Sequence, residues 1–115
     1  MNKKMVTQLF GYNVWAFDKV WDCIGQLTDE QFCLDTGFSH GSIRSQMVHV
    51  ISATRRWLDR LQELPARLHL DSDSFQEKDD LKKEWGLFLK EMRAYIESLD
   101  EASLLEPVRW EIPSR

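Results

Sequence analysis

The sequence has few of the residues that cross-link or interrupt a chain: two cysteines, three prolines and five glycines among 115 residues. Cys23 and Cys33 form no CxxC pair and are too few to hold a disulfide-rich domain together, so we expect reduced thiols. No apolar run approaches the roughly 20 residues that a membrane span needs. The N-terminal stretch has helical patterning rather than a uniform signal core, which favours a cytoplasmic protein without a membrane partner.

An excess of positive charge is also missing. Fifteen basic residues against nineteen acidic ones give a net charge of -4, whereas binding to a phosphate backbone needs a dense cationic surface. Arg55, Arg56 and Arg60 lie close together, but Asp59 and Glu63 stand among them, which is typical of a mixed, solvated helix face. Nucleic acid is therefore not an expected partner.

Apolar and aromatic residues are plentiful. Hydrophobic residues make up 43% of the chain and charged residues 30%, with five tryptophans and six phenylalanines. This composition is typical of a globular protein, and the length suits one domain, residues 1–115, with a real core. Most of the tryptophans are expected in that core rather than in a ligand pocket, although a small-molecule ligand between helices stays open.

Three segments carry apolar residues at steps of three and four, which predicts three long amphipathic helices. The first ends near Leu27, the second runs from about Ser42 to just before Pro65, and the third begins at Lys78. The residues predicted to face inward are Val6, Leu9, Phe10, Asn13, Ala16, Phe17, Val20, Trp21, Ile24 and Leu27 in the first; Ile43, Met47, Val50, Thr54, Trp57, Leu58 and Leu61 in the second; Leu81, Trp85, Phe88, Met92, Ile96 and Leu99 in the third.

The segments between these helices carry recognisable signals. Thr28 and Gln31 have the spacing of a capping box, which predicts a short helix. Residues 66–77 have no sustained period and are expected to be the most flexible connection. Alternation in 108–112 suggests a short extended piece. Asn13 interrupts the first apolar stripe and is expected to hydrogen-bond to a neighbouring helix, because a buried amide needs a partner.

The predicted fold class is therefore all-α, a bundle with three long helices. Bundles of this helix length usually close with a fourth helix. We expect that helix to be absent, with the chain incomplete at its C-terminus, or to be supplied by a partner chain.

Four short motifs resemble the DinB-like family, and their order and spacing match over roughly residues 9–61. They are Tyr12-Asn13-x-Trp15-Ala16, Gly41-Ser42-Ile43-Arg44, His49-Val50 and Ala53-x-x-x-Trp57-Leu58. The resemblance implies an up-and-down four-helix bundle, commonly homodimeric. It also implies a divalent metal, zinc or nickel, held by three histidines: one from the second long helix, corresponding to His49, and two from a last helix that this chain does not contain.

The histidines by themselves give no metal signal. His40, His49 and His69 form neither an HxxH nor an HxxxH pair, and one imidazole cannot hold a catalytic zinc or nickel ion that needs about three protein ligands. From the residues alone, His49 is expected to be half-buried and hydrogen-bonded. The other two would approach it only if their loops folded inward, and we favour the arrangement in which they do not.

Other short patterns have ordinary explanations. Gly37 to Gly41 fit GxSxG, but the strand that must precede a nucleophile elbow is not expected here. Asp71-Ser72-Asp73 resembles the start of a calcium loop, yet Gln76 stands where the loop needs glycine. No cationic cluster that would activate Cys23 or Cys33 is visible.

Two hypotheses about function follow. The favoured one is a homodimeric, non-catalytic member or fragment of the DinB-like family with an incomplete metal site at His49. The alternative is a divalent-metal-dependent transferase or isomerase that acts with a small thiol and uses His49 plus ligands not present in this chain. The sequence does not decide whether the protein is an enzyme.

Overall fold

The structure is a computed structural model that describes residues 2–38, 41–102 and 104. Its helices are α1 (Lys3–Gly25), α2 (Asp29–Cys33), α3 (Ile43–Leu61) and α4 (Lys78–Ser98), with a 3-10 turn, η1 (Ser72–Ser74), in the connection before α4. No strand is present in the described part of the chain. The prediction of an all-α bundle with three long helices is confirmed.

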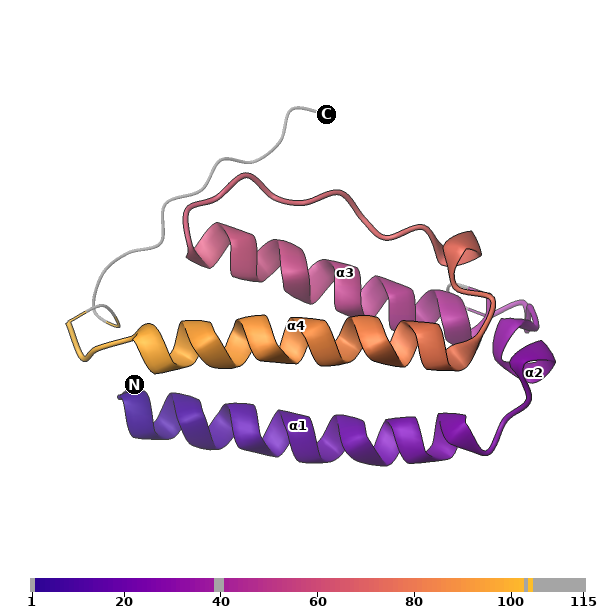
Figure 1. The fold of residues 1–115 in the computed structure, drawn as a ribbon, viewed down its shortest axis with the longest axis horizontal. Coiled ribbons are helices and arrows are strands. Elements are labelled where there is room, and N and C mark those ends of the chain that lie inside the picture. Colours follow the sequence, from indigo (N-terminus) through magenta and orange to yellow (C-terminus); the bar gives the residue numbers. More distant parts are fainter. Residues whose placement is uncertain (1, 39–40, 103, 105–115) are drawn as a thin grey trace.

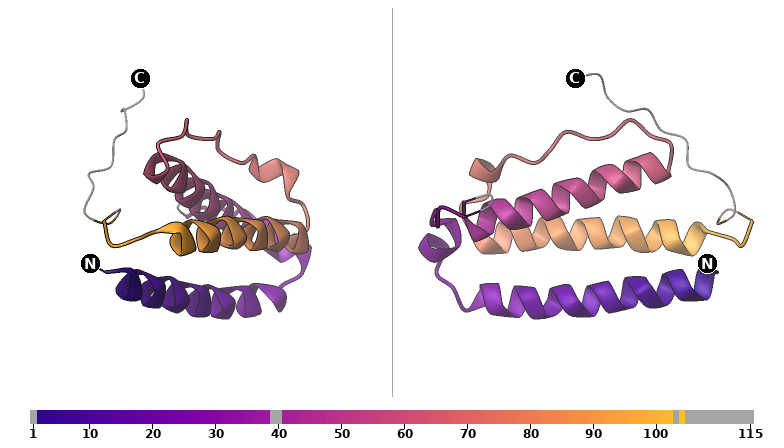
Figure 2. Two further views of the ribbon diagram at one scale, coloured as in Figure 1. Left: turned by 60° about the vertical axis from the view of Figure 1, so that its left-hand side comes forward. Right: turned by 180° about the vertical axis from the view of Figure 1, so that it is seen from behind.

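The long helix α4 lies between α1 and α3 (Figures 1 and 2). α1 runs antiparallel to α4, and Lys3 at its start donates from Nζ to the carbonyl oxygen of Glu97 at 2.9 Å. α3 and α4 run in the same direction, because residues 62–77 pass back along the length of α3 before α4 begins (Figure 1). The helix order therefore differs from the strict alternation of an up-and-down bundle.

Local side-chain contacts explain where the helices begin. Thr28 and Gln31 form the predicted capping box: the Gln31 amide donates to Thr28 Oγ1, and the Thr28 amide donates to Gln31 Oε1. Ser42 caps α3 by accepting from the Ser45 amide at 2.9 Å. Gly41 before it has a φ of +93°, and a Cβ there would lie 3.0 Å from the Asp35 carboxylate, so the turn requires glycine.

The core lies where α1 and α3 pack on α4, and α2 adds to it by packing on α3. The α4 stripe is confirmed in the buried side chains of Leu81, Trp85, Phe88 and Ile96. Phe17 of α1 packs on Trp85 with 4.6 Å between ring centroids. The core cluster comprises Trp21, Ile24, Phe32, Met47, Val48, Ile51, Leu58, Phe75, Leu81, Trp85 and Phe88.

The predicted inward faces of α1 and α3 are wrong at several positions. Leu9 is 51% exposed, Val20 40% and Trp57 51%. Asn13 is exposed as well, and no hydrogen bond joins it to another helix among the described residues. The reason is geometric: α1 and α3 each pack on α4, so each buries only the side of its apolar stripe that faces α4.

The connection from 62 to 77, which includes the segment 66–77 predicted to be the most flexible, makes several side-chain contacts to α3 and α4. Asp59, only 4% exposed, accepts hydrogen bonds from the Arg67 amide at 2.8 Å and from Arg67 Nε at 3.0 Å. The Arg67 guanidinium also donates two hydrogen bonds to the Glu91 carboxylate, and this contact raises the pKa of Arg67. Phe75 adds a buried ring further along. A mixed, solvated face around Asp59 was therefore the wrong interpretation.

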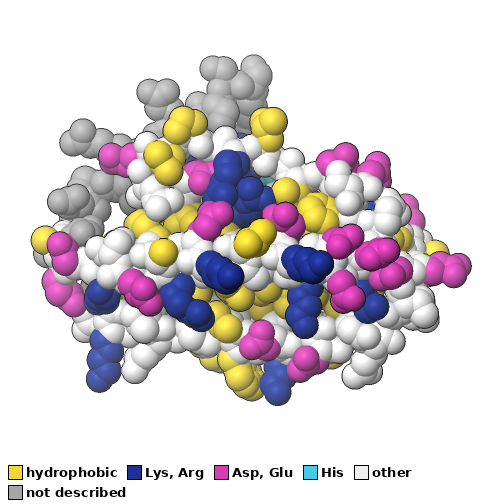
Figure 3. Space-filling model, in the orientation of Figure 1, with side chains coloured by type: hydrophobic (Ala, Val, Ile, Leu, Met, Phe, Trp, Pro, Cys, Tyr) yellow, Lys and Arg dark blue, Asp and Glu magenta, His cyan; other side chains and the backbone are white. Residues whose placement is uncertain are grey.

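The outer surface of α4 and its surroundings is charged. Lys and Arg side chains are interspersed with Asp and Glu across the face seen in Figure 3. No helix in the described ranges is long and apolar enough to cross a membrane.

Candidate functional sites

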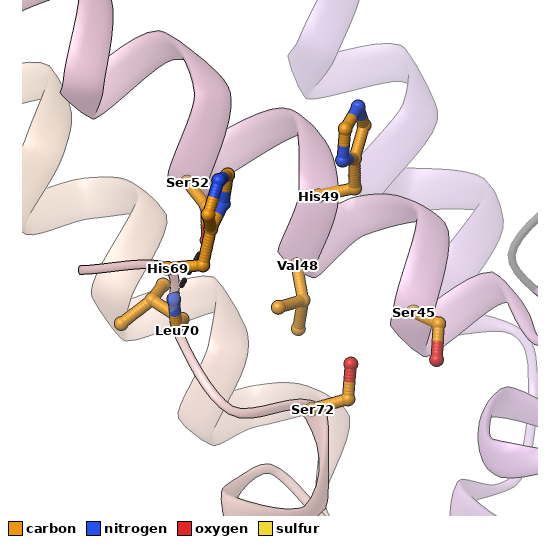
Figure 4. Close-up of a pocket in the computed structure, with 7 residues that line it drawn as sticks. All are labelled: Ser45, Val48, His49, Ser52, His69, Leu70 and Ser72. Carbon is orange, nitrogen blue, oxygen red and sulfur yellow. Dashed lines mark hydrogen bonds between the residues drawn. The ribbon is translucent and has the colours of Figure 1, made fainter. Parts of the chain in front are cut away.

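A pocket of about 470 Å³ lies between α3 and the connection that follows it (Figure 4). We call it the histidine pocket. It is lined by Ser45, Val48, His49, Ser52, His69, Leu70 and Ser72. His49 comes from α3 and His69 from the connection, and their two imidazole rings project in the same direction in Figure 4. The structure thus brings together two of the three histidines, which the sequence analysis had expected to lie apart.

The backbone around His69 is fixed on both sides. Two residues before it, Arg67 is bound to Asp59 by its amide and its guanidinium. One residue after it, the Leu70 amide donates to the Oγ atom of Ser52 at 2.9 Å, and Ser52 is almost fully buried. These contacts hold the His69 backbone against α3, so the position of His69 relative to His49 follows from the packing of the connection.

The surroundings of His69 favour its neutral imidazole. Desolvation of the ring lowers the pKa of His69 although the side chain stays largely exposed, and the positive charge of Arg56 and the neighbouring His49 lower it further. Arg56 itself donates from Nη1 to the carbonyl oxygen of Arg67, which keeps its guanidinium beside the connection. A neutral imidazole is the form that binds metal ions.

The predicted metal position, His49, is exposed and lines the histidine pocket. Within residues 2–38, 41–102 and 104, no three His, Cys, Asp or Glu side chains come together in a way that could hold a metal ion. These residues therefore do not fit a three-ligand catalytic centre of the kind that the family resemblance implies. His40 lies outside the described residues, and the role of His49 as a metal ligand stays a prediction.

A second feature is an open apolar groove between α1 and α3, which we call the helical groove. One cavity in it, of about 160 Å³, has α4 as its floor and is lined by Phe10, Asn13, Val14, Phe17, Thr54, Trp85, Phe88, Leu89 and Met92. The other, of about 420 Å³, is lined by Val20, Cys23, Ile24, Leu27, Ile43, Gln46 and Met47. The groove lies where a fourth helix was expected.

Two other predicted patterns have simple structural roles. Asp71 caps the 3-10 turn by accepting from the Asp73 amide at 3.0 Å, as in an ordinary acidic loop. Ser39 of the GxSxG pattern lies outside the described residues, as does the predicted extended piece at 108–112.

The cysteines are not bonded to each other: Cys23 is exposed and Cys33 is half-buried. A cation does lie beside Cys33, because Arg44 Nη1 approaches its Sγ at 3.5 Å. The sequence analysis missed this contact, since Arg44 is eleven residues away along the chain.

The fold and the sites define a helical-bundle protein with an apolar groove between α1 and α3. A family model described as the DinB family matches residues 1–110. The chain therefore belongs to the DinB family, as its motifs indicated. No curated protein and no solved structure matches the chain.

Proposed function

We propose that this DinB-family protein is a homodimeric, non-catalytic member, and that a second copy of the chain covers the helical groove. The observation that carries the proposal is the groove itself, which leaves large apolar side chains of α1 and α3 in contact with water. Such contiguous apolar surface is rare on proteins that stay monomeric. The proposal includes a cytoplasmic location, which the two unpaired cysteines support.

A second copy is a suitable occupant because the same surface carries both hollows and protruding side chains. Leu9 lies four residues before Asn13, and Trp57 lies three residues after Thr54, so each lies on the same face of its helix as a groove-lining residue. A two-fold interface uses one patch on both subunits. The protruding Leu9 and Trp57 of each copy can then fill the hollows of the other.

The non-catalytic part of the proposal is supported by the small number of potential metal ligands in the histidine pocket. In the described part of the chain two histidines share the histidine pocket, whereas catalytic zinc sites commonly use three protein ligands and keep one position open. A transferase or isomerase that uses a metal at His49 is the alternative, and it requires further ligands. Metal-dependent turnover of a small thiol by the tag-free chain would favour that alternative.

The test compares two tryptophans of similar exposure on different surfaces. Trp57 is 51% exposed and lies on α3 three residues after the groove-lining Thr54. Trp15 is 57% exposed on α1, two residues before Phe17 and so on the side away from α4. Light-scattering mass across a concentration series should give about twice 13.6 kDa for the wild-type chain and for Trp15→Asp. For Trp57→Asp we expect the monomer mass, because a buried charge without a partner opposes association.

A wild-type chain that stays monomeric throughout the series would overturn the dimer. So would a dimer that Trp15→Asp disrupts and Trp57→Asp does not, since the interface would then lie elsewhere. Far-ultraviolet circular dichroism of both variants checks that the helices are intact.

A further inference from the structure

We infer that the smaller cavity of the helical groove, of about 160 Å³, binds a neutral one-ring aromatic molecule that carries a single hydrogen-bonding group, such as a phenol. We call this space the aromatic cavity. It shares no lining residue with the histidine pocket. All its lining residues come from one chain, so the inference goes beyond the proposed dimer and does not depend on it.

The volume of the aromatic cavity selects a ligand with a single ring. A cavity of about 150 Å³ with apolar walls stays dry inside a protein and binds benzene or xenon. The aromatic cavity is close to that volume, whereas clefts that hold drug-sized ligands measure roughly 300 Å³ or more. Spaces between the helices of a bundle are also a common place for small-molecule sites.

Four aromatic side chains line the cavity and favour an aromatic ligand. Phe10 and Phe17 come from α1, and Trp85 and Phe88 come from α4. The ring centroid of Trp85 lies 4.6 Å from that of Phe17 and 5.8 Å from that of Phe88, so these three rings form one packed cluster. Aromatic rings attract a further ring in offset or edge-to-face geometry. Because the cluster is already packed, a ligand does not have to order it.

The polar groups around the cavity determine the polarity of the ligand. None of the lining residues is an acid or a base, and burial of an unpaired charge is costly, so a neutral molecule is favoured. Asn13 lines the cavity, is exposed and makes no hydrogen bond in the described part of the chain. Thr54, in contrast, already donates its hydroxyl to the carbonyl oxygen of Val50. The ring of the ligand therefore lies inward, with its polar group toward the Asn13 amide.

The experiment titrates the isotope-labelled, tag-free full chain with phenol and follows it by nuclear magnetic resonance. We expect one saturable site, with Overhauser contacts from the phenol ring to the methyl groups of Val14 and Met92. Benzoate should bind at least about tenfold more weakly at neutral pH, because its carboxylate finds no partner among the lining residues. Arg93 lies over the Phe10 ring, 5.7 Å from its centroid, and is the cation that would reverse this order. Tighter binding of benzoate would overturn the assignment of a neutral ligand.

Two variants test the polar contact and the cavity separately. Asn13→Leu should lower the affinity for phenol about two- to tenfold, which corresponds to one hydrogen bond, and should leave the affinity for toluene unchanged. Gln8→Leu is the matched control, because Gln8 is exposed on α1 and does not line the cavity. Val14→Phe adds bulk to the wall of the cavity and should weaken the binding of both phenol and toluene. An unchanged phenol affinity in Asn13→Leu would contradict the polar contact.

Three results would overturn the inference: no saturable phenol binding, full affinity in Val14→Phe, or Overhauser contacts to Val20 and Ile43 of the wider cavity instead. The monomeric variant Trp57→Asp separates the inference from the dimer. Equal phenol binding by this variant and the wild-type chain agrees with a site within one chain. Binding by Trp57→Asp alone would mean that a second copy fills the cavity, so the inference would be wrong while the dimer stands. Binding by the wild-type chain alone would mean that the site needs two copies, which also contradicts the inference.

Discussion

One side of α3 is covered by the connection that follows it, whereas the other side borders the open helical groove. On one side, a connection without any regular pattern is held against α3 by Asp59, Ser52 and the buried ring of Phe75. On the other side, α1 and α3 carry strong apolar periodicity and yet leave the helical groove between them. Irregular chain can thus be tightly fixed where buried polar partners exist, and a regular helix can stay partly uncovered where its packing partner lies on only one side.

The largest expected effect compares two adjacent residues on α3. Leu58→Ala should lower the free energy of unfolding by about 3 kcal/mol, because it leaves a cavity in the core. Trp57→Ala removes a larger side chain that is half exposed, so at low protein concentration it should change stability by less than about 1 kcal/mol. Urea denaturation of both variants at the same concentrations measures the two values.

A large loss of stability in Trp57→Ala that persists at the lowest protein concentration would contradict this prediction, because Trp57 would then support the fold of the monomer. A loss of stability that grows with protein concentration would agree with a role of Trp57 in association. Mass action stabilises an associating wild-type chain more strongly as its concentration rises, whereas a variant that associates weakly gains less.

A second prediction concerns the covered side of α3. Asp59→Ala should cost about 2 to 3 kcal/mol, because it removes charge-assisted hydrogen bonds to the amide and guanidinium of Arg67 from a buried position. Glu91→Ala breaks the outer contact of the same guanidinium, where water already reaches the pair, and should cost about 1 kcal/mol or less. Thermal unfolding followed by circular dichroism compares the two.

Hydrogen exchange adds a local test of the same contacts. In Asp59→Ala the amides of Arg67 and Leu70 should exchange faster, while amides in the middle of α1 keep their protection. Equal costs for the Asp59 and Glu91 variants would contradict the view that the buried end of this network fixes the connection.

The smallest expected effect is a gain. Glu63, where the chain leaves α3, has a φ of +57°, a left-handed conformation that glycine adopts without the steric cost of a Cβ. Glu63→Gly should therefore raise the free energy of unfolding by about 0.5 to 1 kcal/mol. Chemical denaturation measures it, and Gln62→Gly is the control, because Gln62 has a negative φ of -88° and should lose stability instead.

Much of the architecture was predictable from local signals. The capping residues Thr28 and Ser42 and the α4 stripe gave the helix boundaries and one buried face correctly, because capping and periodicity act over a few neighbouring residues. The candidate site was less predictable. His69 stands in a segment without a period, and nothing in its spacing indicates that the connection returns along α3 to meet His49.

The sequence by itself determined that this chain forms three long helices, that its class is all-α, and that it belongs to the DinB family. These properties follow from short-range hydrogen bonding, helical periodicity and motif spacing. Only the tertiary structure decided that α3 and α4 run parallel, that Trp57 is half exposed rather than buried in the core, and that His49 and His69 share a pocket. Those outcomes depend on which helix packs on which, and periodicity identifies an apolar face without identifying its partner.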